Sequence, residues 1–216
     1  MKIIGHRGAR GLAPENTLPS FKKALDIGVD QIEFDVRVTH DHVPILYHNA
    51  TIVDGAGDKF LISNCRYEDL KAHKPDLAKL EEALETVKGA VPLYIEVKSD
   101  VNIGPIVEIL KGYRHAYALS SFSQRTLREL QTSLPKIPKI VIDNWSGVRA
   151  RLRAKQIGTR TIAMNQTWLW SGFIRAMKRS GYELYAYTVN NPAKARRWAK
   201  YGLAGVITDY PDRFKN

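Results

Sequence analysis

Short apolar runs alternate with segments of helical spacing along most of the chain. Eight of these runs are predicted strands, because they are short, rich in β-branched and aromatic residues and bounded by turn-forming residues. They cover residues 2–5, 31–37, 93–97, 116–120, 138–142, 161–164, 183–188 and 205–208. Between them, segments such as 17–27 and 80–88 repeat apolar residues every three or four positions, which indicates amphipathic helices.

The eightfold alternation of strand and helix predicts an α/β fold, namely a (β/α)8 TIM barrel. An open, doubly wound sheet is the competing architecture. The length of 216 residues suits one barrel, so we expect a single domain over residues 1–216. The connection after the second strand, about residues 39–79, contains Gly- and Asp-rich turns and breaks the regular alternation. We interpret it as a small insertion over the mouth of the barrel.

Two carboxylates lie on one side of the second predicted strand. Glu33 and Asp35 are two positions apart, while Ile32, Phe34 and Val36 occupy the alternate positions. If the apolar set packs against the outer helices, both carboxylates point into the barrel. Two adjacent buried carboxylates are costly unless they share a proton or bind a cation.

The third predicted strand repeats this spacing with Glu96 and Lys98. In isolation, an ion pair between these two side chains explains them as well as a metal site does. Together with Glu33 and Asp35, however, Glu96 completes three hard oxygen donors of the kind that Mg²⁺ and Ca²⁺ prefer. We therefore predict that these three carboxylates form a divalent metal site.

Two histidines follow strand-like runs. His6 and Arg7 stand at the end of the first strand, where barrel enzymes place their active sites, between glycines that let a ligand approach the backbone. His48 follows the β-like residues 43–47, which return the chain toward the same rim. We expect the two imidazoles to lie opposite each other across the site. His40 and His42 flank a polar turn and are predicted to be exposed.

Seven short motifs span the chain from its first strand to its last. They are Gly5-His6-Arg7-Gly8, Pro14-Glu15-Asn16-Thr17, Glu33-Phe34-Asp35-Val36, the Pro44-to-His48 segment, Glu96-Val97-Lys98, Thr188-Val189-Asn190 and Gly205-Val206-Ile207-Thr208-Asp209-Tyr210-Pro211. In this order they resemble the motifs of the glycerophosphodiester phosphodiesterase family. The chain departs from the family at Asn49, where Asp is common, and at Tyr187, where Trp is common.

The resemblance implies an enzyme that hydrolyses glycerophosphodiesters to glycerol 3-phosphate and an alcohol, with a divalent metal, Mg²⁺ or Ca²⁺, as cofactor. By the same resemblance each site residue has a role: His6 and His48 as catalytic acid and base, Glu33, Asp35 and Glu96 as metal ligands, Arg7 and Lys98 as phosphate-binding cations, and Glu15 as a supporting carboxylate. A phosphodiester is an anion that resists attack, and these groups supply charge neutralisation and proton transfer.

Charge and composition add further expectations. Lys and Arg outnumber Asp and Glu by 33 to 22, and the net charge of +11 favours anionic partners. Peripheral contact with an anionic membrane therefore stays open, as do a lysophospholipase D activity on lipid-like substrates and a non-catalytic anion-binding role. No specific nucleic-acid partner and no particular oligomeric state are indicated.

A cytoplasmic protein is expected, because no apolar run approaches the ~20 residues that cross a bilayer and Cys65 has no disulfide partner.

Overall fold

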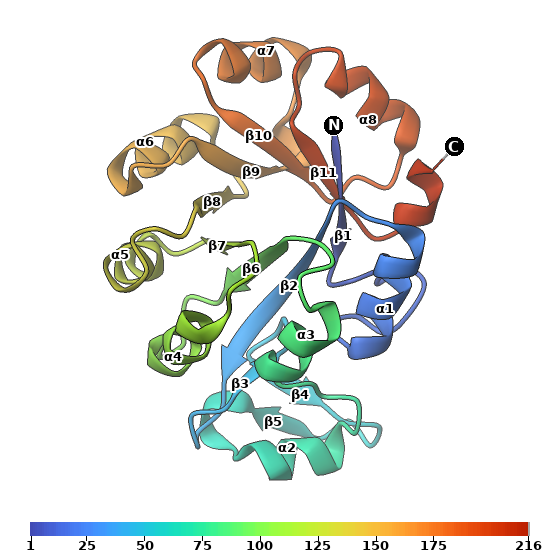
Figure 1. Ribbon diagram of the computed structural model, residues 1–216, viewed down its shortest axis with the longest axis vertical. Helices are drawn as coiled ribbons and strands as arrows, with labels where there is room; N and C mark the ends of the chain where they lie inside the picture. The colour runs from blue at the N-terminus through green and yellow to red at the C-terminus, as the bar shows by residue number, and fades with distance from the viewer. Residues whose placement is uncertain (216) are drawn as a thin grey trace.

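Eight parallel strands close into a barrel in the computed structural model, which describes residues 1–215 (Figure 1). They are β1 (Lys2–His6), β2 (Gln31–Val38), β6 (Leu93–Val97), β7 (Tyr117–Ser121), β8 (Lys139–Asp143), β9 (Thr161–Asn165), β10 (Glu183–Tyr187) and β11 (Gly205–Thr208). The barrel is closed because β1 pairs with β11 on one side and with β2 on the other. The predicted (β/α)8 architecture is therefore confirmed, and the open doubly wound sheet is wrong.

Helices surround the barrel and separate successive strands. They are α1 (Leu18–Ile27), α3 (Leu80–Val87), α4 (Gly104–Gly112), α5 (Gln124–Ser133), α6 (Gly147–Ile157), α7 (Ser171–Arg179) and α8 (Pro192–Ala199), and the 3₁₀ helix η3 (Pro211–Phe214) follows β11. Several begin where the sequence supplies an N-cap, since Thr17, Ser123, Ser146 and Asn191 each accept a backbone N–H of the first helical turn. Among the described residues, no helix combines the length and the apolar character that crossing a membrane requires.

Alternation along the strands separates the outer core from the barrel interior. Ile32, Phe34 and Val36 of β2 are fully buried in the layer between strands and helices. The interior is a smaller cluster, to which Tyr94 and Ile207 belong. Because neighbouring residues of a strand point to opposite faces, this arrangement sends the carboxylates of β2 inward, as the sequence predicted.

The insertion after β2 forms a small subdomain with its own core. It contains β3 (Pro44–Leu46), which pairs antiparallel with β2, the hairpin of β4 (Thr51–Val53) and β5 (Lys59–Leu61), the 3₁₀ helix η1 (Ile62–Asn64) and α2 (Tyr67–His73). Its buried cluster includes Ile52, Tyr67 and Leu70. In Figure 1 most of the insertion lies beside the barrel, beyond β2, and residues 48–50 line a hollow at the mouth. The expected insertion is present, but it does not cover the mouth as a whole.

Candidate active site

Three buried carboxylates meet at the carboxyl ends of β2 and β6. Asp35 and Glu96 are direct partners in the parallel register, and Glu33 precedes Asp35 by one pleat. One oxygen from each of the three side chains lies within 4.8 Å of the others. All three residues are buried: Glu33 is 3% exposed, Asp35 is 1% exposed and Glu96 is 8% exposed. The two-residue spacing along the predicted strands therefore correctly indicated that these carboxylates lie close together.

Two cations of the protein already compensate part of this negative charge. The Nζ atom of Lys98 lies 2.5 Å from Oδ1 of Asp35 and also contacts Oε1 of Glu96. The Nε atom of Arg7 lies 3.0 Å from Oδ2 of Asp35. The ion pair that competed with the metal hypothesis for Glu96 is therefore present, and it coexists with the cluster of three carboxylates.

The protonation of the three carboxylates differs because their neighbours differ. Burial opposes the ionisation of Asp35, but Lys98 and Arg7 outweigh it and lower its pKa to about 2. Burial and the charge of Asp35 raise the pKa of Glu96 to about 7. Burial, Asp35 and Glu96 raise the pKa of Glu33 well above its usual value. In the protein alone the cluster holds protons near neutral pH, and a divalent cation that displaced them would find three hard oxygen donors.

His6 ends β1 and is held from the far end of the chain. Its Nδ1 lies 2.6 Å from Oδ1 of Asp209, and its Nε2 lies 3.9 Å from Oε2 of Glu33. Burial opposes the ionisation of Asp209, but hydrogen bonds from His6 and from Asn190 outweigh it and lower the pKa of Asp209. An ionised Asp209 only accepts, so Nδ1 of His6 carries the hydrogen and Nε2 is free toward the site.

The pKa of His6 lies below its usual value, because burial outweighs the hydrogen bond to Asp209. Burial likewise lowers the pKa of His48. Both imidazoles are therefore mostly neutral at pH 7, and each can accept a proton.

His48 reaches the mouth of the barrel through the insertion. Its backbone oxygen accepts a hydrogen bond of 3.0 Å from Nε of Arg37, a residue of β2, and this bond holds the loop against the barrel. A hollow of ≈ 260 Å³ is lined by His48 together with Glu96 and Lys98. The insertion thus brings the second histidine to the edge of the acidic cluster.

A smaller hollow of ≈ 30 Å³ lies deeper in the mouth. It is lined by His6, Glu33, Tyr94, Glu96, Phe122, Ile142, Tyr187 and Ile207. Glu96 and Phe122 border both hollows, so the two open into the same region. The mouth therefore combines acidic, basic and imidazole groups with an aromatic wall. This combination suits a small anionic ligand.

Comparison with known proteins identifies the chain. Residues 6–213 match the model of the glycerophosphoryl diester phosphodiesterase family. The chain belongs to the glycerophosphoryl diester phosphodiesterase family. Family membership makes it a phosphodiester-hydrolysing enzyme, as the sequence motifs predicted, and the match extends over nearly the whole barrel.

Curated relatives agree with this assignment, and a solved structure agrees with the fold. The chain is 28% identical to the YhdW protein of Bacillus subtilis, covering 98% of this chain and 96% of the relative. It is 25% identical to a glycerophosphodiester phosphodiesterase of Caldanaerobacter subterraneus, covering 99% and 96%. Its fold is similar to that of a phosphodiesterase of Oleispira antarctica, solved with its product sn-glycerol-3-phosphate, with a TM-score of 0.90, 24% identity and coverage of 99% and 95%.

The loop motif of this phosphodiesterase explains why Arg7 and Gly8 follow His6. Arg7 adopts φ 51° and its N–H donates to Oε2 of Glu33 at 2.9 Å, so the turn itself orients one carboxylate of the cluster. Gly8 adopts φ 85°, and a Cβ there would lie 2.1 Å from Oγ of Ser20. Only glycine fits this close approach between the turn and α1.

Glu15 lies at the edge of the site and not in the acidic cluster. Its Oε1 accepts from Nη1 of Arg7 at 2.7 Å, and its Oε2 lies 3.2 Å from Nε of Arg10. With 39% of its side chain exposed, it holds the Arg7 guanidinium in place from the solvent side. We expected Glu15 to support the metal or its bound oxygens, but in the structure its side chain contacts Arg7 and Arg10 instead.

Asn16 and Asp209 are site residues to which sequence reasoning gave no role. The side chain of Asn16 donates from Nδ2 to Oδ2 of Asp35 at 2.9 Å and accepts the N–H of Asp35 at Oδ1, 3.1 Å away. Asn16 is 2% exposed and adopts φ 56°, a conformation that Asn tolerates better than most residues. Asn16 lies in the motif of residues 14–17 and Asp209 in that of residues 205–211, and this was the one feature of the sequence that pointed to them.

The two departures from the family lie at the mouth. Oδ1 of Asn49 lies 2.7 Å from Nδ1 of His48, so a neutral amide orients this ring. The hydroxyl of Tyr187 donates to Oδ1 of Asn144 at 2.7 Å, and its ring meets Phe122 edge to face at 6.2 Å. Tyr187 thus keeps the aromatic wall and ties it to the loop after β8.

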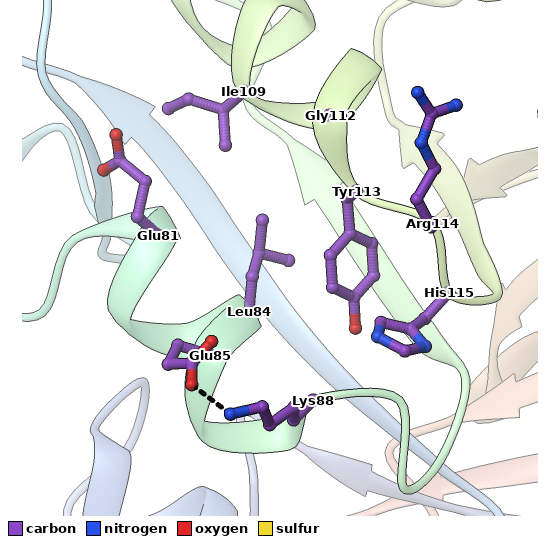
Figure 2. A pocket seen from close by; sticks show the side chains of 9 residues that line it. All are labelled: Glu81, Leu84, Glu85, Lys88, Ile109, Gly112, Tyr113, Arg114 and His115. Carbon is purple, nitrogen blue, oxygen red and sulfur yellow. Dashed lines mark hydrogen bonds and ion pairs between the residues drawn. The ribbon is translucent and has the colours of Figure 1, made fainter.

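Figure 2 shows a separate hollow of ≈ 340 Å³ on the outside of the barrel. Leu84 of α3 and Ile109 of α4 face Tyr113 across it, and Lys88 pairs with Glu85 at its edge. Tyr113 belongs to the loop that enters β7 at its amino end. The candidate active site lies at the opposite, carboxyl ends of the strands, so this hollow is not part of it.

Proposed function

We propose that this enzyme hydrolyses glycerophosphodiesters to glycerol 3-phosphate and an alcohol, as one catalytic domain. The observation that carries the proposal is the trio of buried carboxylates flanked by two mostly neutral histidines at one barrel mouth. The printed names of the relatives and the glycerol phosphate bound to the Oleispira antarctica protein support the choice of substrate class.

The carboxylates of Glu33, Asp35 and Glu96 would hold one divalent cation, Mg²⁺ or Ca²⁺. Such a cation would neutralise charge on the phosphate oxygens and so make phosphorus easier to attack. The donor set fits such a cation, because three carboxylate oxygens within 4.8 Å of one another suit an ion that prefers oxygen ligands. The cluster itself contains no thiol and no imidazole.

His6 and His48 would divide the proton transfers between them. Each has a pKa below its usual value, so each can take a proton from an attacking hydroxyl at neutral pH and then return it to the leaving alcohol. Each ring is oriented through Nδ1, that of His6 by the ionised Asp209 and that of His48 by the amide of Asn49.

Arg7 and Lys98 would bind the phosphate from the two sides of Asp35. Both keep their positive charge, because the neighbouring carboxylates outweigh burial and raise the pKa of each. Binding to phosphate would require these cations to share their charge between Asp35 and the substrate, which a bound divalent cation on Asp35 would facilitate.

An activity panel tests the proposal. Glycerophosphocholine is incubated with the protein after chelation and after addition of Mg²⁺, Ca²⁺ or no metal, and released glycerol 3-phosphate is measured. We expect metal-dependent release that His6→Ala abolishes. Release by the His6→Ala protein at the wild-type rate would contradict the assigned roles, and absence of release with every metal would contradict the substrate class.

A lysophospholipase D activity on lipid-like substrates is the second candidate. It is favoured by exposed apolar side chains at the rim, among which Trp145 and Trp168 are 65% and 48% exposed. Turnover of lysophosphatidylcholine against glycerophosphocholine separates the two candidates. The family assignment favours both over the non-catalytic anion-binding protein.

A further inference from the structure

The net positive charge of the chain comes from one part of it. Residues 144–203 contain 12 Lys and Arg residues and a single acidic residue, Glu183. The remainder of the chain has 21 basic and 21 acidic residues, so its formal charge is zero and the whole +11 belongs to residues 144–203. This segment comprises α6, α7 and α8, which stand next to each other on one side of the barrel (Figure 1).

The same segment exposes large apolar side chains. Trp145 and Trp170 are each 65% exposed, and Trp168 is 48% exposed. On α6, Val148 is 72% and Leu152 is 59% exposed. Soluble surfaces rarely gather three tryptophans and two aliphatic side chains in this way without a binding role. We call these five residues the tryptophan rim.

The contacts between elements make the tryptophan rim continuous. The rings of Trp145 and Trp168 lie 6.4 Å apart, which joins the loops after β8 and β9. A Cβ at Gly147 would lie 2.3 Å from the ring of Phe173, so the first turns of α6 and α7 are in close contact. Val148 and Leu152 are four positions apart on α6 and therefore share one exposed face.

The tryptophan rim lies at the same end of the barrel as the candidate active site. Trp145 follows the end of β8 by two residues. Asn144, its neighbour, accepts a hydrogen bond from Tyr187, which lines the inner hollow together with His6 and Glu96. A surface that met the rim would therefore also meet the mouth of the barrel.

We propose that the tryptophan rim docks on the anionic surface of a phospholipid bilayer. Tryptophan rings favour the interface between water and hydrocarbon, and aliphatic side chains beside them add buried apolar area. The basic side chains of α6–α8, Arg151 and Lys155 of α6 among them, attract a surface of negative lipids over distances of about a Debye length. Docking would present the barrel mouth to lipid head groups.

Two other occupants fit these observations less well. Nucleic acid would meet the basic side chains and could stack on tryptophan, but it gains little from Val148 and Leu152, which are the aliphatic part of the rim. A second copy of the chain would bring two surfaces of the same strong positive charge together. The bilayer is the occupant that uses both the apolar and the charged features.

Binding to sedimented vesicles tests this docking without any catalytic measurement. Vesicles of phosphatidylcholine are compared with vesicles that also contain phosphatidylserine, at low and high salt. The wild type should bind the anionic vesicles and lose that binding at high salt. Trp145→Gln with Trp168→Gln, and separately Val148→Gln with Leu152→Gln, should each weaken binding roughly 10-fold or more.

Matched controls separate docking from general charge attraction. Arg151→Glu with Lys155→Glu should weaken binding at least about 10-fold, whereas Lys22→Glu with Lys23→Glu, the same charge change on α1, should not. Val53→Gln with Leu61→Gln changes two exposed apolar residues of the insertion and should leave binding unchanged. Thermal unfolding checks that every variant is folded.

Three outcomes would overturn the proposal. The first is absence of binding to anionic vesicles by the wild type. The second is an equal loss in the α6 and α1 charge variants, which would mean that no particular face is used. The third is tight binding to duplex DNA that the vesicles do not displace, which would assign the surface to nucleic acid. Each outcome is independent of whether the proposed hydrolysis is correct.

Discussion

His6 and Asp209 are 203 positions apart in the sequence, and Nδ1 of the histidine lies 2.6 Å from Oδ1 of the aspartate. The pairing of β1 with β11 creates this contact, because both strands end at the same rim. One carboxylate at the last strand thus fixes the tautomer of an imidazole on the first strand.

Asp209→Asn tests that relationship. The amide cannot stabilise the His6 imidazolium, so the pKa of His6 should fall further and the acid limb of the pH–rate profile should move to lower pH. We expect kcat/KM to fall roughly 10- to 100-fold, as is common for groups that orient a site residue. Asp212→Asn, an exposed neighbour on η3, serves as the control and should change neither the rate nor the profile. An unchanged acid limb in Asp209→Asn would exclude this positioning role.

His48→Ala tests the second proposed proton-transfer group. Loss of a general acid or base is expected to lower kcat by about 10²–10⁴-fold, while the acidic cluster stays intact. The measurement is the rate of glycerol phosphate release together with metal binding by calorimetry. His40→Ala and His42→Ala, which replace two exposed histidines of the same insertion, should retain wild-type rates. A His48→Ala protein with full kcat would remove His48 from the mechanism.

Asn16→Ala should weaken the site through Asp35. The substitution removes a buried donor to the carboxylate and a buried acceptor of the Asp35 N–H, which typically costs about 1–3 kcal/mol of stability. Thermal or urea unfolding measures this loss, and metal affinity should fall with it. Asn16→Gly accommodates the φ of 56° without a Cβ, so its smaller loss would separate the side-chain bonds from the backbone strain. Equal stability of wild type and both variants would contradict the assignment.

The stability of the chelated protein should depend on the protonation of Glu96. Its pKa is about 7 in the folded protein against an ordinary value of 4.5, so the folded state binds more protons between these pH values. This contribution to the free energy of unfolding therefore decreases as the pH rises through that window. Glu96→Gln cannot lose a proton and should show a shallower decrease in unfolding temperature.

His6 and His48 act in the opposite direction, because their pKa values are lowered from 6.5 and their contribution rises with pH up to that value. Both proteins retain these histidines, so the difference between wild type and Glu96→Gln reports Glu96 together with its effect on the pKa of Glu33, which the Glu96 charge helps to raise. Added Mg²⁺ or Ca²⁺ should stabilise the wild type more at pH 8 than at pH 5, since the ligands must be deprotonated. Parallel unfolding curves across pH 4.5 to 7 would contradict the raised pKa.

The local pattern of the sequence was enough for the strands and for the direction of the carboxylates. Alternation over two residues fixes which side of a strand is apolar, so Ile32 and Phe34 faced the helices and Glu33 faced the interior as predicted. The predicted strand ends differ from the observed ones by about one residue, because the ladder partners of neighbouring strands decide where pairing stops.

Long-range contacts decided the rest of the site. Asp209 meets His6 because the barrel closes, and Asn16 meets Asp35 because the loop before α1 folds over β2. The position of His48 depends on the bond between its backbone and Arg37 in the adjoining strand. These contacts join residues that are not related by a local repeat, so the spacing of residues in the sequence did not predict them.

Sequence alone determined the barrel class, the family motifs and the three acidic side chains, since each depends on the order and period of nearby residues. Only the tertiary structure decided how charge is balanced within the site. Lys98 and Arg7 both reach Asp35, and Asp209 reaches His6, because closure of the barrel places distant segments side by side.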